Sequence, residues 1–272
     1  MLNLKLNEES TDTSQVSYLT EKDSKKIEKY FKSFDYLNND ELQVLHLKKI
    51  THVGISSLKQ GSLFISEFSN YLINQINKDF EQITFLMKEF NQVIEQYDSK
   101  KTSLFSRKQN IFEIYHQTKD VVSQIVEKLQ QLYQRFQIHL EQIEITYIPK
   151  YSRAEYMLNR DMILLTQFNE FISNHSLIAN LIMPFAKEIE LISKNIVYQK
   201  QLVSQKYQLL MTIKHNIEHY IQHIQYISNV SQHTMSAMLD LEILSKLPKT
   251  NNEQNQMQAE TVILKMKEAL KI

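Results

Sequence analysis

Apolar residues recur at steps of three and four along most of this chain, which is the spacing of a single helical face. The clearest run covers residues 111–147, where the steps alternate between four and three for more than four heptads. A sustained heptad pattern is typical of a coiled-coil-like helix. Its seam contains two polar residues, Thr118 and His139, among Ile111, Tyr115, Val122, Ile125, Leu129, Leu132, Phe136 and Ile143.

A second long helix is predicted from Phe185 to about residue 247, where Pro248 is expected to end it. Proline disfavours the α conformation in the residue before it, so Pro149 is likewise expected to end the helix over 111–147. The spacing of apolar residues by three and four is shorter or less regular in the other segments. It predicts helices over 21–34, 39–50, 56–97 and 151–173, and it is interrupted over 97–109, which predicts a loop.

These elements predict an all-α fold, because apolar helical stripes without strands can be buried only against each other. We expect one elongated antiparallel bundle with long coiled-coil-like helices over residues 19–247. Residues 1–18 are polar and predict a disordered N-terminal tail. Residues 248–272 predict a polar linker, over 249–258, followed by a short C-terminal helix over 259–271.

The composition supports long helices and excludes several function classes. The chain of 272 residues contains two glycines and three prolines. Hairpins and phosphate-binding loops need residues at positive φ, which glycine usually supplies, so Walker and Rossmann sites are not expected. Cysteine is absent, which excludes disulfides, thiolate metal ligands and thiol redox chemistry within the chain.

Charge and targeting signals narrow the possible partners. Acidic and basic residues are balanced at 31 each, and only four of the basic residues are arginine, so no nucleic acid partner is expected. The first residues lack a basic region followed by an apolar core, so we expect a cytoplasmic protein. The longest stretch without formal charge, Phe171–Ala186, is too short and too polar for a membrane span, so membrane contact is expected to be peripheral at most.

Residues 215–223, HNIEHYIQH, place three histidines four residues apart. The pattern H-x-x-E-H occurs in some zinc peptidases, and here it would use His215, Glu218 and His219, with His223 one turn further on. At about 100° per residue, however, the three histidines lie nearly opposite the apolar stripe of the same helix. We therefore interpret His215, His219 and His223 as a solvated face and not as a metal site. No catalytic residue and no cofactor is assigned.

Residues 65–76, ISEFSNYLINQI, resemble the ISEFSD stretch of the toxic anion resistance proteins, the TelA-like tellurite-resistance family. The order of further motifs over about 50–245 is similar to that family, and it comprises Ser103–Ser106, Leu132–Tyr133, Tyr147–Ile148, Pro184–Ile189 and Thr234–Leu239. The chain departs from the family at Pro149–Lys150, where Ala-Gly is usual, and in having no tryptophan.

The resemblance implies a cytoplasmic, helix-rich protein linked to tolerance of tellurite or of cell-envelope antimicrobials. Without cysteine this chain cannot itself reduce tellurite through thiols. Direct oxyanion binding would need converging cations, and the candidates are Lys150, Arg153 and Arg160, which fall roughly on one side of the helix expected after Pro149. The alternative is that these three are solvated charges on a helical surface.

Three functions remain open at this point. The first is a non-catalytic scaffold or adaptor in stress tolerance, which binds protein partners through its helical faces. The second is a membrane-active, pore-forming type of helical protein that uses Phe171–Ala186 as an apolar tongue. The third is a metal-dependent hydrolase that uses His215, Glu218 and His219. Heptad seams close equally well within one chain or between chains, so a homo-oligomer is also open.

Overall fold

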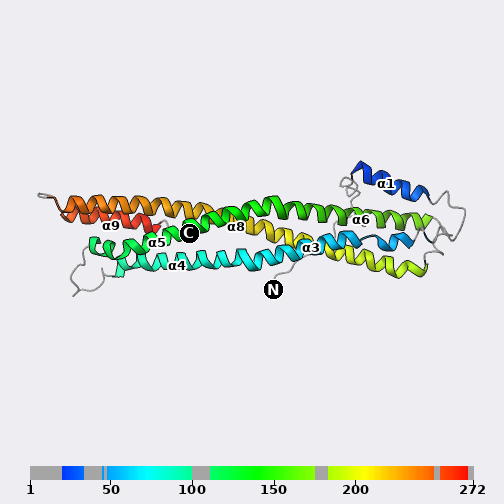
Figure 1. Ribbon diagram of the computed structural model, residues 1–272, viewed down its shortest axis with the longest axis horizontal. Helices are drawn as coiled ribbons and strands as arrows, with labels where there is room; N and C mark the ends of the chain where they lie inside the picture. The colour runs from blue at the N-terminus through cyan, green and yellow to red at the C-terminus, as the bar shows by residue number, and fades with distance from the viewer. Residues whose placement is uncertain are drawn as a thin grey trace, which may run out of the picture. The chain divides into compact units, whose positions relative to one another are not determined.

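Every secondary-structure element described in the computed structural model is helical (Figure 1). The structure describes residues 20–33, 45, 48–99, 111–174, 183–247 and 252–268. No strand occurs within these ranges, which confirms the all-α prediction. The predicted tail over 1–18 and most of the helix predicted over 39–50 and of the loop over 97–109 lie outside the described residues.

The chain divides into two compact units, each built from two separate segments. Unit 1 comprises Met1–Phe68 and Thr146–Leu209, and unit 2 comprises Ser69–Ile145 and Leu210–Ile272. This division differs from the single bundle that the sequence predicted over 19–247. Periodicity identifies the buried face of a helix but not the helix that covers it, so it could not distinguish one group of helices from two.

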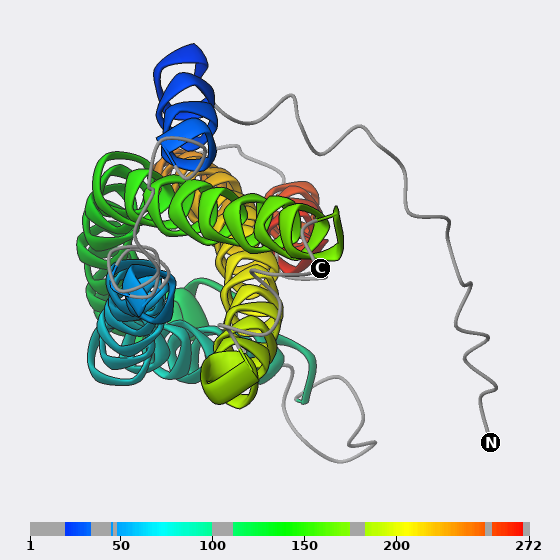
Figure 2. The same cartoon turned by 90° about the vertical axis from the view of Figure 1, so that its right-hand side faces the viewer.

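Unit 1 is built on α6 (Ile148–Asn174) and contains α1 (Glu21–Lys32), the 3₁₀ turn η3 (Lys49–His52), α3 (Ile55–Tyr71) as far as Phe68, η6 (Met183–Phe185) and the first part of α8 (Ala186–Ser245). The Thr20 hydroxyl caps α1 by accepting a hydrogen bond from the Asp23 amide at 3.2 Å. Figure 2 shows α1 lying beside α6. Phe31 joins the two helices, with ring centroids 6.5 Å from Phe168 and 5.4 Å from Phe171.

The two glycines of the chain lie at or just before α3, where the backbone is close to side chains of α8. A Cβ atom at Gly61 would lie 2.9 Å from Cγ of Gln199 and 3.2 Å from Cγ2 of Val203. Seven residues earlier, Gly54 has φ of +90°, and a Cβ there would lie 3.0 Å from Cδ1 of Ile196. The absence of side chains at these two positions therefore allows the backbone of α3 to approach α8.

Unit 2 contains the predicted heptad seam on α5 (Ile111–Gln142), together with the π turn η4 (Leu72–Ile76), α4 (Asn77–Ser99), the rest of α8 and α9 (Asn252–Glu268). The seam is buried from Tyr115 to Ile143, which confirms the prediction. Both polar members are buried too, and the Thr118 hydroxyl donates to the Ile114 carbonyl at 2.9 Å. The apolar stripe predicted on α8 is likewise largely buried, including Ile196, Val203, Leu210, Ile217, Ile224 and Ile227.

The prediction that Pro149 ends a helix is wrong. Residues 111–174 are helical throughout, and Pro149 is the second residue of α6. The π turn η5 (Ile143–Tyr147) lies directly upstream. Its hydrogen bonds are offset by one residue from the α pattern, which accommodates both the missing proline N–H and the ring.

The predicted linker over 249–258 is wrong from residue 252 onward, because α9 already begins at Asn252. No glycine or proline interrupts this segment, and α9 is held by the burial of Ala259, Ile263 and Met266. The proposed apolar tongue over 171–186 lies half outside the described residues. Among the helices that the structure describes, none is both long enough and apolar enough to cross a membrane.

Candidate functional site

A cavity of about 360 Å³ in unit 1 brings together charged and apolar side chains from three segments of the chain. Its walls are residues of α1, of the turn from Lys49 to Gly54 with the start of α3, and of α6. Small-molecule sites are typically concave and apolar with a few placed polar groups. This combination makes the cavity the best candidate for a functional site among the described residues.

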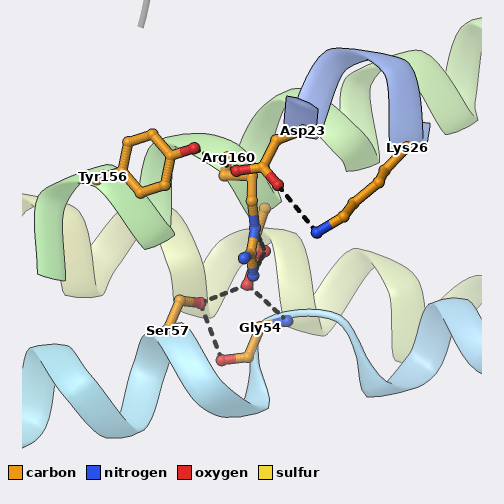
Figure 3. Close-up of polar contacts among 7 residues, drawn as sticks. Asp23, Lys26, Gly54, Ser57, Tyr156 and Arg160 are labelled. Carbon is orange, nitrogen blue, oxygen red and sulfur yellow. Dashed lines mark hydrogen bonds and ion pairs between the residues drawn. The ribbon is translucent and has the colours of Figure 1, made fainter. Parts of the chain in front are cut away.

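The polar part of the lining centres on the buried carboxylate of Asp161, on α6. Its partners Gly54, Ser57 and Arg160 lie close together in Figure 3. Oδ2 accepts from the Gly54 amide at 3.1 Å and lies 2.7 Å from the Ser57 hydroxyl. Oδ1 accepts from Nε and Nη2 of Arg160, at 3.0 and 2.7 Å. Four donors match the acceptor capacity of a carboxylate, so Asp161 is satisfied by the protein itself.

The Asp161 carboxylate also explains why α3 begins where it does. Gly54 precedes the helix in a left-handed conformation, and its carbonyl accepts the first helical bond, from the Leu58 amide at 2.7 Å. The Ser57 hydroxyl lies 3.0 Å from the same carbonyl, and its single proton serves either that oxygen or Asp161. A negative charge at a helix N-terminus is favourable, so Asp161 acts as a cap supplied from another helix.

A second polar group lies at the rim of the cavity. The Tyr156 hydroxyl of α6 donates to Oδ2 of Asp23, and Lys26 Nζ lies 3.5 Å from Oδ1 of the same carboxylate (Figure 3). The hydrogen bond from Tyr156, followed by the charge of Lys26, holds the pKa of Asp23 below its ordinary value of 3.8, against burial, which acts in the opposite direction. Asp23 is therefore an anion that already has partners.

The rest of the lining is largely apolar. Ile27 of α1 and Ile50 of η3 are buried, and Leu164 of α6 is half-buried. Tyr30 of α1 also lines the cavity, and burial raises the pKa of its phenol to about 12. The phenol therefore stays protonated at neutral pH. Lys49 and His52 also line the cavity, and both are exposed.

The structure does not bring the predicted oxyanion contacts Lys150, Arg153 and Arg160 together. Lys150 forms an ion pair with Glu67, and Arg160 binds Asp161. Ten residues of helix separate these two cations by about 15 Å along the axis. Arg153 is exposed between them. Of the three, only Arg160 belongs to the cavity, with a role that the sequence did not suggest.

The three histidines of α8 differ in their surroundings. His215 and His219 are exposed as predicted, but His223 is buried, at 9 % exposure. The prediction of one solvated face is wrong for His223. His223 lines a hollow of about 420 Å³ together with Ile83 and Met87 of α4, so this part of α8 faces another helix. The rings of His219 and His223 are 6.4 Å apart.

These histidines do not form a metal centre with each other. In the part of the chain that the structure describes, no three His, Asp or Glu side chains lie where they could hold one ion together. Glu218, the general base of the hydrolase hypothesis, lies 3.7 Å from Lys214. The geometry therefore offers no catalytic zinc arrangement around His215, Glu218 and His219.

Unit 2 contains a largely buried polar chain that runs from α3 to α5 and from there to α4. Tyr71 Oη lies 2.5 Å from Nδ1 of His139, whose Nε2 lies 2.9 Å from Oδ2 of Asp79. Oδ1 of Asp79 accepts from Arg135 Nε at 3.0 Å, and Arg135 Nη2 donates to Gln82 at 2.6 Å. A ring protonated at Nε2 satisfies both contacts, because Nδ1 then accepts from Tyr71.

Sequence reasoning identified His139 as a polar seam position but not its partners. Asp79 and Tyr71 are eight residues apart in the same predicted helix, which places them near one helical face. This spacing was the only indication in the sequence that the two side chains could meet the same partner. Asp161 gave no comparable signal, because it contacts residues more than one hundred positions away. Gly54 could have suggested a special backbone conformation, since glycine is so rare here.

Comparisons with protein family models, with curated proteins and with solved structures found no match to this chain. The resemblance to the toxic anion resistance proteins therefore rests on the sequence motifs described above.

Proposed function

We propose that this protein is a non-catalytic helical scaffold or adaptor that binds a partner protein through exposed apolar positions near the end of α8. Its biological setting follows from the resemblance to toxic anion resistance proteins, namely tolerance of tellurite or of envelope toxins. A cytoplasmic location belongs to the same proposal. Two structural features support it.

The observation that carries the proposal is an apolar patch consisting of Leu239, Ile243, Leu244 and Leu247. Leu239, Ile243 and Leu247 are spaced by four residues and are 51 %, 53 % and 50 % exposed. At about 100° per residue, Leu239 and Ile243 lie opposite the buried side of α8, which includes Met238 and Leu241, and Leu247 follows two residues after the helix ends at Ser245. Helical spacing of this kind fits the apolar stripe of a second helix, so the expected partner presents an amphipathic helix.

The second support is the use of the polar groups in the interior. Asp161 and Asp79 are both engaged with protein donors, and each joins helices of its own unit. Side chains that act as acids or bases must reach a substrate, whereas these are occupied in holding helices in register. A protein whose interior polar groups are structural is better suited to presenting a surface than to turnover.

The test is affinity capture with the full chain from cells that naturally express it, grown with and without tellurite. The variant Leu239→Gln/Ile243→Gln is compared with wild type and with the control Ile73→Gln/Leu191→Gln, whose side chains are 60 % and 59 % exposed. We expect a partner that wild type and control retain and the patch variant loses. The same variant should reproduce the tellurite sensitivity of a strain that lacks the protein.

Light scattering on the purified chain distinguishes a second copy from a different partner. If the patch joins two copies, wild type and control will have twice the mass of the patch variant. Equal capture and equal tellurite tolerance for all three proteins would show that the proposal is wrong.

A further inference from the structure

We infer that the cavity between α1, η3 and α6 binds a small carboxylate that carries an apolar group. This inference goes beyond the scaffold function and does not depend on it. It rests on the geometry of unit 1 alone, and the charges around the cavity decide the class of ligand.

The acidic groups of the cavity are occupied, whereas part of its positive charge is not. Asp161 lies within hydrogen-bond distance of four donor groups, and Asp23 is bound by Tyr156 and Lys26. Lys49, by contrast, has no acidic partner among the described residues, and His52 contacts only the Thr51 hydroxyl within them, at 3.3 Å. An anion that binds at Lys49 therefore does not have to break an existing ion pair.

The buried part of the lining favours a ligand with an apolar group. Ile27, Ile50 and Leu164 line the interior, and Tyr30 adds a protonated phenol. A bare oxyanion would leave these side chains without contact, and a hydrocarbon would not use Lys49. A volume of about 360 Å³ is at the lower end of the range for ligand sites. A short alkyl or aryl carboxylate satisfies the charge, the apolar wall and the size together.

Asp161 makes the site rigid without contacting the ligand. It fixes Arg160 on one wall and the Gly54 amide on another through one carboxylate. Two of the five N–H groups of Arg160 are used in this way, which leaves the outer edge of the guanidinium for the ligand. Walls held by buried hydrogen bonds need little reorganisation when a ligand binds, and this favours binding.

The probe is octanoate, titrated into the full chain by isothermal calorimetry. We expect saturable binding at one site, with acetate and inorganic phosphate at least about tenfold weaker, since each buried methylene contributes roughly fourfold in affinity. Octylamine has the same chain and the opposite charge, and it should also bind more weakly. Equal binding of octylamine, or no saturable binding of octanoate, overturns the inference.

Two variants locate the site. Ser56→Trp places a large side chain at the exposed rim and should abolish binding, while Lys59→Trp on the same helix, outside the cavity lining, should not. Lys49→Gln should weaken binding about threefold, and Lys59→Gln should leave it unchanged. Circular dichroism confirms that each variant is folded. Octanoate binding that neither Ser56→Trp nor Lys49→Gln changes would lie elsewhere, and the assignment would be wrong.

Discussion

Two buried aspartates, Asp161 in unit 1 and Asp79 in unit 2, both hold an arginine but do so in different settings. Asp161 binds a backbone amide and a serine at the start of a helix, and a cavity lies beside it. Asp79 binds only side chains, His139 and Arg135, within a packed seam. Asp161 therefore fixes the backbone at the start of α3 beside a cavity, whereas Asp79 holds α4 and α5 together.

The difference shows that burial of charge does not by itself indicate a functional site. Buried ion pairs and their hydrogen bonds often fix register and add little net stability, yet removing one partner is costly. What distinguishes Asp161 is the adjoining cavity, whose rim contains Lys49, a cation without an acidic partner among the described residues. The four predictions below test this contrast in order of decreasing effect.

Asp161→Ala should lower the free energy of unfolding by about 3 kcal/mol, because it leaves Arg160, Ser57 and the Gly54 amide without their acceptor. Denaturation followed by circular dichroism measures the loss, and hydrogen exchange should increase in the first turn of α3. Glu170→Ala, at an exposed position of the same helix, is the control and should change little. An equal loss in both variants would contradict the role given to Asp161.

Gly54→Ala should cost about 2 kcal/mol, because a side chain is strained at φ of +90° and would press on Ile196. Gly61→Ala is the matched substitution within a helix, where gain of about 1 kcal/mol in helix propensity partly offsets the close contact with Gln199. Thermal unfolding of the two variants gives the comparison. A larger loss at Gly61 would show that helix packing, and not the backbone at Asp161, limits unit 1.

Tyr71→Phe should cost about 1 kcal/mol, since it removes the hydrogen bond to the buried ring of His139. Tyr156→Phe removes the equivalent bond to Asp23 at the cavity rim, where water can replace the hydroxyl, and should cost less than about 0.5 kcal/mol. Urea denaturation of both variants measures the difference. Similar losses would mean that the rim of the cavity is as enclosed as the seam of unit 2.

The smallest effect concerns pH. Because the folded pKa of Asp23 lies below 3.8, its contribution to stability is complete above that value and disappears as pH falls through the folded pKa. Asp23→Asn should therefore lower stability slightly at neutral pH, and its difference from wild type should disappear as pH falls below about 4, so the acid side of its stability profile is flatter. Thermal unfolding over pH 2 to 6, compared between wild type and variant, measures this change in slope. A parallel shift of the two curves would exclude the assignment.

The sequence predicted the buried faces well and the partners poorly. The seam from Tyr115 to Ile143 followed from spacing alone, since a heptad pattern records burial directly. The effect of Pro149 was predicted wrongly, because the helix tolerates this proline only through the π turn before it. No feature of the local sequence indicates that turn. His223 was misplaced because α4 covers more of α8 than its apolar stripe implies.

The candidate site could not be predicted from the sequence, because its residues come from distant parts of the chain. Asp161, Gly54 and Ser57 meet across more than one hundred residues, and a single sequence carries no record of contacts at that distance. Arg160 was predicted as a candidate anion-binding residue and lines the cavity, whereas the other two candidates, Lys150 and Arg153, do not. Spacing along one helix identifies residues that share a face, and it says nothing of what the opposite wall supplies.

The interleaved segments of the two units have a consequence for synthesis on the ribosome. Unit 1 requires residues up to Leu209. Its first segment therefore cannot complete its packing until Ser69–Ile145 and the second segment of unit 1 have been synthesised. Neither unit can therefore fold completely while the rest of the chain is still being synthesised. Apolar helix faces of the nascent chain stay exposed until α8 is nearly complete. Nascent chains stopped before that point should be clients of chaperones, and fragments cut between the units should not replace the intact protein.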